Sequence, residues 1–97
     1  MAKYRLSNVA KEDLIRIHQY GVKTFGEKLA DTYFHNLFEH FEKIATNPYA
    51  FEAVDYIKQG YRKCTCGVDT IYFKINTENA TVDIMAIVGR QDVNNIL

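Results

Sequence analysis

Two stretches of helix-like apolar spacing, which meet at Phe25-Gly26, constrain the fold of this chain more than any other feature. In the first stretch, apolar or small residues recur every three or four positions, which predicts one face of a helix over residues 8–24. Those residues are Ala10, Leu14, Ile17, Gly21 and Phe25. Ser7 stands directly before this helix, where its hydroxyl can accept a hydrogen bond from an unpaired backbone N–H. Gly21 leaves space on the inner face, so another backbone can approach closely.

The second stretch predicts a longer helix that begins soon after Gly26 and ends before Pro48. Its apolar stripe comprises Leu29, Ala30, Tyr33, Leu37, Phe41, Ile44 and Ala45. Gly26 can adopt the left-handed backbone conformation that ends a helix, and Pro48 disfavours the helical conformation for Asn47 before it. Because so few residues connect the two helices, they must lie antiparallel and form an αα-hairpin.

The segments before and after the hairpin have the pattern of β-strands. Residues 4–6 predict a short first strand, and residues 61–66, 68–75 and 81–88 predict three more, the last of which is apolar enough for a central strand. Residues 48–60, which precede these three strands, are expected to be irregular. The order β-α-α-β-β-β indicates an α+β fold, in which the helical hairpin packs on a mostly antiparallel sheet.

Length and composition limit the classes of protein to which the chain can belong. A chain of 97 residues forms one modest core, so residues 1–97 are expected to make a single domain. Twelve basic and twelve acidic residues cancel, and we therefore expect no direct sequence-specific binding of nucleic acid. The polar start of the chain does not resemble a signal peptide, and no apolar run is long enough to span a membrane. We expect a cytoplasmic protein with reduced thiols and no membrane partner.

Few residues suggest catalysis or metal binding. The sequence has no glycine-rich phosphate loop and no nucleophile elbow. His18, His35 and His40 all fall on the predicted helices, at spacings that differ from that of a zinc-binding helix. Cys64 and Cys66 place two sulfurs on one face of a strand, but tetrahedral zinc needs four ligands, and no second pair accompanies them. We expect no catalytic residue, metal or cofactor.

Five basic residues are the only Lys and Arg residues in the last forty positions, and all lie on or beside predicted strands. They are Lys58, Arg62, Lys63, Lys74 and Arg90. Such a cluster can bind RNA phosphates or the acidic side chains of a protein partner. Equally, it can be a set of solvated charges at a sheet edge that prevent aggregation. Arg62 and Lys63 are neighbours in a strand, so they point to opposite faces and can share one patch only at an edge.

Five short motifs occur in order along nearly the whole chain. They are Leu6-Ser7-x-x-Ala10-x-x-Asp13-Leu14, Phe25-Gly26, Gly60-Tyr61-Arg62-Lys63, Ile71-Tyr72-Phe73 and Ile87-Val88-Gly89-Arg90-Gln91-Asp92-Val93. Together they resemble the ParE toxin family of the RelE/ParE superfamily. The resemblance implies the fold predicted above and a role in a type II toxin–antitoxin system.

The resemblance also implies a partner and a target. A small antitoxin, usually with a ribbon-helix-helix DNA-binding domain, would wrap its disordered C-terminal part over the helical hairpin and the sheet. Characterised ParE relatives poison DNA gyrase, whereas RelE relatives cleave mRNA on the ribosome. We therefore expect a gyrase inhibitor that is neutralised by a ParD-like antitoxin. The alternatives are a ribosome-dependent mRNA interferase of the RelE type and a degenerate toxin that only binds its antitoxin.

The sequence departs from the RelE pattern where RNA cleavage needs groups that move protons and stabilise charge. Val88 and Gly89 stand where a His or another polar group often occurs in those relatives. Asp69 occupies a position that is often basic, and an acid there would repel an RNA backbone. We therefore expect a protein that binds other macromolecules and is not an enzyme.

The residues expected to contact the antitoxin lie on or beside the strands that follow the hairpin. They are Tyr61, Arg62, Lys63 and Arg90. The basic groups among them would meet acidic side chains of the antitoxin.

Overall fold

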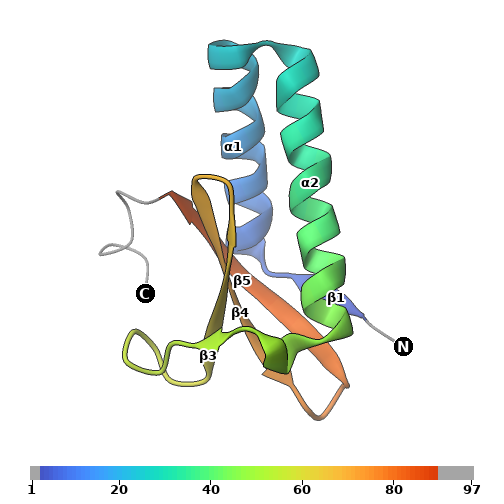
Figure 1. Cartoon of the computed structure of the whole chain (residues 1–97), viewed down its shortest axis with the longest axis vertical. Coiled ribbons are helices and arrows are strands. Elements are labelled where there is room, and N and C mark those ends of the chain that lie inside the picture. Colours follow the sequence, from blue (N-terminus) through green and yellow to red (C-terminus); the bar gives the residue numbers. More distant parts are fainter. Residues whose placement is uncertain (1–2, 90–97) are drawn as a thin grey trace.

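The computed structural model describes residues 3–89, in which two helices pack on one face of a five-stranded sheet (Figure 1). The elements are β1 (Tyr4–Leu6), α1 (Asn8–Phe25), α2 (Glu27–Thr46), the 3-10 helix η1 (Pro48–Ala50), β2 (Glu52–Ala53), β3 (Tyr61–Cys66), β4 (Asp69–Asn76) and β5 (Thr81–Gly89). The strands lie in the order β1-β5-β4-β3-β2. All neighbouring strands are antiparallel except β1 and β5. The structure confirms the predicted α+β fold, with a helical hairpin on a mostly antiparallel sheet.

The sheet contains one strand that the sequence pattern does not predict. Glu52 and Ala53 form β2 within the segment that is expected to be irregular, and they pair with Lys63 and Arg62 of β3. A strand of two residues is too short to show a periodicity of its own. It exists because the fold brings it beside β3, and it becomes the edge of the sheet.

The helical hairpin forms as predicted. Ser7 Oγ accepts a hydrogen bond from the Ala10 N–H at 3.0 Å, which confirms Ser7 as the N-cap of α1. Gly26 separates the two helices with a backbone φ of +94°. A Cβ atom at Gly21 would lie 3.2 Å from the Cβ of Ala30, so glycine at this position lets the helices approach closely. Neither of these helices has the apolar length that crossing a membrane requires.

Apolar clusters lie on both faces of the sheet. The larger cluster fills the space under the helices and includes Leu37, Phe41, Ile44, Ile71, Phe73 and Ile84. The smaller cluster lies on the outer face, away from the helices, and consists of Val54, Tyr61, Tyr72, Ala86 and Val88. Full burial of one large apolar side chain contributes ~1.5–3 kcal/mol to folding. β5 lies between β1 and β4 and contributes to both clusters, and accordingly six of its nine residues are apolar.

Side chains of α1 take the place of a neighbouring strand along the second half of β5, beyond the reach of β1. Ser7 Oγ donates a hydrogen bond to the Met85 carbonyl at 2.8 Å. The Asp13 carboxylate accepts the Ile87 N–H at 3.0 Å, and Arg16 donates to the Ile87 carbonyl at 3.3 Å. These contacts satisfy backbone groups that would otherwise offer a template to another strand.

Replacing Asp13 by Ala removes the acceptor of the Ile87 N–H and leaves that partly buried donor unpaired. We expect the free energy of unfolding, measured by urea titration, to fall by ~1–3 kcal/mol. Glu12→Ala, at the adjacent exposed position of α1, is the matched control and should change the free energy by less than ~0.5 kcal/mol. Equal stability of the two variants would contradict the role assigned to Asp13.

Candidate functional site

The predicted contact residues Tyr61, Arg62 and Lys63 lie side by side on β3 but do not form one patch. The registers of β3 with β2 and β4 place Tyr61 and Lys63 on the outer face and Arg62 on the face that carries the helices. The fourth predicted residue, Arg90, lies outside the described residues. Contact between these residues and an antitoxin stays a prediction, and their positions show which parts of them are available for it.

Arg62 has a structural role within the chain. Its guanidinium donates a hydrogen bond to the Phe51 carbonyl at 2.6 Å and lies 5.2 Å from the centre of the Tyr49 ring. A charge-assisted hydrogen bond and a cation–π contact each contribute on the order of 1 kcal/mol. Together they hold the segment that follows α2 against β3.

Tyr61 and Lys63 also make contacts within the chain. Tyr61 is buried in the outer cluster, and the Lys58 ammonium lies 5.6 Å from the centre of its ring. Lys63 Nζ lies 3.8 Å from the Glu52 carboxylate on β2. Because the Lys63–Glu52 pair is open to solvent, it contributes at most ~1 kcal/mol. Lys63 can therefore exchange Glu52 for another acidic group with little loss of stability.

The three histidines lie on the helices, and none lies on the described part of the sheet. His18 Nε2 lies 2.7 Å from the Asp31 carboxylate across the hairpin, and His40 Nδ1 lies 2.8 Å from the Asn36 carbonyl. Tyr72 on the sheet is buried, and burial raises its pKa above the ordinary value. A tyrosine with a raised pKa keeps its proton at neutral pH and cannot act as a base.

Cys64 and Cys66 point to the same side of β3, as predicted, and both belong to the core under the helices. Burial raises the pKa of each thiol, so both stay protonated and weakly nucleophilic at neutral pH. Within residues 3–89, no three potential metal ligands come together. The two cysteines therefore act as small core residues in this part of the chain.

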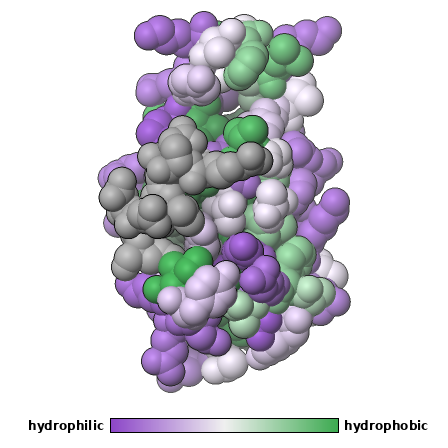
Figure 2. Space-filling model, turned by 60° about the vertical axis from the view of Figure 1, so that its left-hand side comes forward, coloured by the Kyte–Doolittle hydropathy of each residue, from purple (hydrophilic) through white to green (hydrophobic). Residues whose placement is uncertain are grey.

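A largely apolar cavity of about 310 Å³ lies between the tip of the helical hairpin and the turn from β3 to β4. We call it the hairpin-tip cavity; its lining includes Tyr20, Phe25, Leu29, Tyr33, Val68 and Asp69. The hairpin projects beyond the β3–β4 turn (Figure 1), and residues of both line the cavity. In Figure 2, apolar residues are visible among polar ones at this upper end of the molecule. An apolar concavity with a few polar groups is a common form of binding site.

A buried polar contact lines one side of the hairpin-tip cavity. The Tyr33 hydroxyl lies 2.7 Å from both the Asp69 carboxylate and the Cys66 carbonyl, so two acceptors share its one proton. Asp69 is only 6% exposed, so it does not present an open negative charge as the sequence suggested. Burial and the Asp69 carboxylate raise the pKa of Tyr33, which keeps the hydroxyl protonated.

Gly67 in the β3–β4 turn makes the approach of Tyr33 possible. A Cβ atom at this position would lie 2.9 Å from the Tyr33 ring, closer than side chains tolerate. The backbone φ of Gly67 is +59°, a conformation that other residues rarely adopt. Glycine is therefore required here for two independent reasons.

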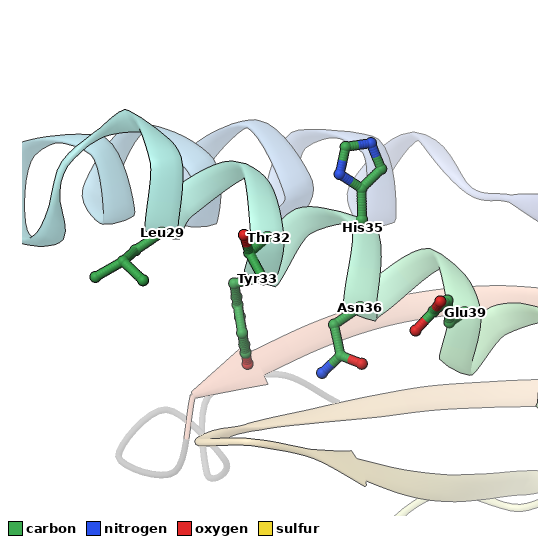
Figure 3. A pocket seen from close by; sticks show the side chains of 6 residues that line it. All are labelled: Leu29, Thr32, Tyr33, His35, Asn36 and Glu39. Atoms are coloured by element: carbon green, nitrogen blue, oxygen red, sulfur yellow. The ribbon is translucent and has the colours of Figure 1, made fainter.

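The exposed side of α2 continues from the cavity as an open hollow of mixed polarity (Figure 3). It is lined by Leu29, Thr32, Tyr33, His35, Asn36 and Glu39. Figure 3 shows Tyr33 and Asn36 pointing from the helix toward the strands, whereas His35 points away from them. The hollow thus offers hydrogen-bonding groups next to the apolar cavity.

Sequence reasoning did not identify Tyr33, Leu29 or Val68 as site residues. Tyr33 and Leu29 belong to the apolar stripe of α2, and residues with this spacing are usually core. Leu29 is instead exposed, because its turn of the helix extends past the ends of the strands (Figure 3). The sequence feature that could have indicated this site is Gly67, because a glycine between two strands marks a tight turn or a close approach of another group.

Tyr33→Phe removes the hydroxyl that donates a hydrogen bond to the buried Asp69 carboxylate. We expect the free energy of unfolding to fall by ~1–3 kcal/mol, because the carboxylate loses a partner without regaining water. Tyr20→Phe, at an exposed tyrosine of α1, is the control and should change it by less than ~0.5 kcal/mol. A double-mutant cycle with Asp69→Ala measures the coupling between the two groups, and a coupling near zero would contradict their interaction.

Comparison with known sequences identifies the family. A model of the family described as ParE toxin of type II toxin-antitoxin system, parDE, matches residues 4–93. A protein of Mycobacterium tuberculosis (strain CDC 1551 / Oshkosh) named Toxin ParE1 is 30% identical over 97 residues, which cover 99% of this chain and 98% of the relative. A Toxin ParE1 of Caulobacter vibrioides is 28% identical over 85 residues and covers 88% of each chain.

Solved structures show the same fold at low sequence identity. A chain of the chromosomal ParDE toxin–antitoxin system from P. aeruginosa has a TM-score of 0.79 at 16% identity, over 92% of this chain and 96% of that chain. A chain of the toxin–antitoxin complex RelBE2 from Mycobacterium tuberculosis has a TM-score of 0.64 at 16% identity, over 94% and 93%. The resemblance expected from the five sequence motifs is thus confirmed. This chain belongs to the ParE toxin family of type II toxin–antitoxin systems.

Proposed function

We propose that this toxin acts in the cytoplasm by binding and inhibiting DNA gyrase, and that a ParD-like antitoxin neutralises it. The observation that carries the proposal is the match to the ParE family over residues 4–93. Characterised ParE relatives poison gyrase. The two solved structures of the same fold come from toxin–antitoxin systems, which supports an antitoxin as the partner.

The chemistry of the described residues supports binding rather than catalysis. Cleavage of RNA requires a group that removes the 2′-hydroxyl proton and groups that stabilise the charged intermediate. On the sheet, Tyr72 is buried with a raised pKa, and Asp69 is buried against Tyr33. Lys63 offers an ammonium group that can bind an anion.

Tyr61, Arg62, Lys63 and Arg90 remain our proposed antitoxin contacts, with different roles for the first three. Lys63 would bind an acidic side chain directly, because Glu52 is its present partner and that pair is open to solvent. Arg62 would contribute through the accessible part of its guanidinium while it continues to hold Phe51. Tyr61 is buried and would support Lys63 from within the outer cluster.

A supercoiling assay with purified gyrase tests the target. We expect the toxin to inhibit supercoiling or to trap cleaved DNA, and the same toxin pre-mixed with its antitoxin should leave gyrase unaffected. Active gyrase in the presence of free toxin would contradict the proposal. Codon-positioned cuts in mRNA from expressing cells would then indicate the RelE-type alternative, and unimpaired growth on induction would indicate a degenerate toxin.

Lys63→Glu tests the charged contact with the antitoxin. The change places a carboxylate next to Glu52 and toward acidic partner groups, so we expect antitoxin affinity to fall by about tenfold at low salt and less at high salt. Lys63→Arg keeps the charge and is the matched control, with an expected change under about twofold. Equal affinity of the two variants, measured by titration calorimetry, would remove Lys63 from the site.

A further inference from the structure

The carboxylate of Asp69 is buried in the wall of the hairpin-tip cavity and pairs with no Lys, Arg or His side chain of residues 3–89. Asp69 is only 6% exposed. Tyr33 donates to one of its two oxygens and shares that proton with the Cys66 carbonyl. A carboxylate is rarely buried this far without a cation, because removal from water destabilises its charged form. This wall of the cavity therefore offers a negative charge that the described chain does not balance.

Aromatic and aliphatic side chains form most of the remaining wall. The aromatic residues are Tyr20 and Phe25 of α1 and Tyr33 of α2, and the aliphatic ones include Leu29 and Val68. The face of an aromatic ring attracts a cation electrostatically, and the attraction is stronger where water is excluded. A cavity with such walls and one carboxylate suits a molecule that combines a positive charge with an apolar body.

The charged residues around the cavity also favour a cationic occupant. Among the described residues at this end of the molecule, the carboxylates outnumber the Lys and Arg side chains; the former are Asp13, Glu27, Asp31 and Asp69, and the latter are Arg16, Lys23 and Lys28. Arg16 pairs with Asp13 at 3.3 Å. Lys23 and Lys28 are exposed and do not line the cavity. None of these three cations is thus placed to neutralise Asp69.

Contacts within the chain form the cavity, so it exists before any ligand binds. A Cβ atom at Gly21 would lie 3.2 Å from that of Ala30, and Gly67 leaves the space that the Tyr33 ring occupies. A preformed site loses little conformational entropy on binding. The volume of about 310 Å³ corresponds to roughly ten waters at ~30 Å³ each, which is the lower end of the range for small-molecule sites.

We propose that the hairpin-tip cavity binds a small organic cation, in which a primary ammonium group is attached to an aromatic body. The ammonium donates to the Asp69 oxygen that Tyr33 leaves without a hydrogen bond. The aromatic body packs against Tyr20, Phe25 and Leu29. This site is additional to the inhibition of gyrase proposed above and does not depend on it.

The test titrates the purified full-length toxin with three probes of similar size that differ in charge, followed by NMR at the backbone amides of Val68 and Asp69. The probes are 2-phenylethylammonium, 2-phenylethanol and phenylacetate. We expect the ammonium probe to bind about tenfold more tightly than the alcohol, because its hydrogen bond to Asp69 is charge-assisted. Phenylacetate should bind more weakly than either. Equal affinity for the ammonium probe and the alcohol, or no saturable binding of the ammonium probe, would overturn the inference.

Asp69→Asn tests the role of the carboxylate. The amide keeps an acceptor for the Tyr33 hydroxyl but loses the charge, so the preference for ammonium over alcohol should fall from about tenfold to under about twofold. Asp31→Asn removes the same charge from an exposed position at the same end and is the matched control, in which the preference should persist. An equal loss in both variants would show that only overall charge matters, and the inference would fail. Urea titration verifies that each variant is folded.

Phe25→Ala tests the aromatic wall at a residue that is 62% exposed, so the fold does not depend on it. Loss of the ring should weaken binding of the ammonium probe by about threefold to fivefold. Tyr56→Ala is the matched control, because Tyr56 is an exposed aromatic residue (74%) that does not line the cavity. Its affinity should stay within about twofold of the wild type. If Phe25→Ala bound the probe as tightly as this control, the cation would lie elsewhere and the assigned site would be wrong.

Discussion

The contact between Tyr33 and the β3–β4 turn sets the distance between α2 and that turn, on which the width of the hairpin-tip cavity depends. The hydroxyl reaches Asp69 and the Cys66 carbonyl, and the ring occupies space that only Gly67 leaves open. This contact fixes the upper half of α2 relative to the sheet, above the level at which the core residues Leu37 and Phe41 hold its lower half. Without it, α2 would lose its hydrogen bonds to Asp69 and to the Cys66 carbonyl. The cavity between tip and turn would then have no fixed width.

Within the described residues, the edges of the sheet are covered by other groups of the chain, whereas the hairpin tip is not. Along the second half of β5, α1 supplies a carboxylate, a hydroxyl and a guanidinium to backbone groups that lack a strand neighbour. On the other side, the short strand β2 and Arg62 cover the beginning of β3. Both devices discourage unspecific strand pairing. The tip has no such protection within the described residues, and its apolar side chains Tyr20, Phe25, Leu29 and Val68 are 61–68% exposed.

The sequence predicts those parts of the fold that local chemistry determines. The helix expected over residues 8–24 spans Asn8–Phe25, because Ser7 and Gly26 are start and stop signals that act within a few residues. The sequence does not predict β2, because these two residues become a strand only by pairing with β3. The roles of Arg62 and Asp69 could not be predicted for the same reason. Their partners, Phe51 and Tyr33, come into contact with them only in the folded chain. From the sequence alone, a charged residue in a strand is interpreted as a surface group, because the partner that it contacts in the fold is not known.

Lys63 and the hairpin-tip cavity lie toward opposite ends of β3, and their separation limits how one partner segment could reach both. Lys63 is near the start of the strand, and Val68 follows its end. Three residues of strand at ~3.3 Å each and two residues of turn place them at most about 17 Å apart. A partner segment can span this distance with about five extended residues or with ~11 residues of helix. A compact domain that touches only one end would leave the other exposed. A partner that contacts both would therefore have to be an extended segment that orders as it binds.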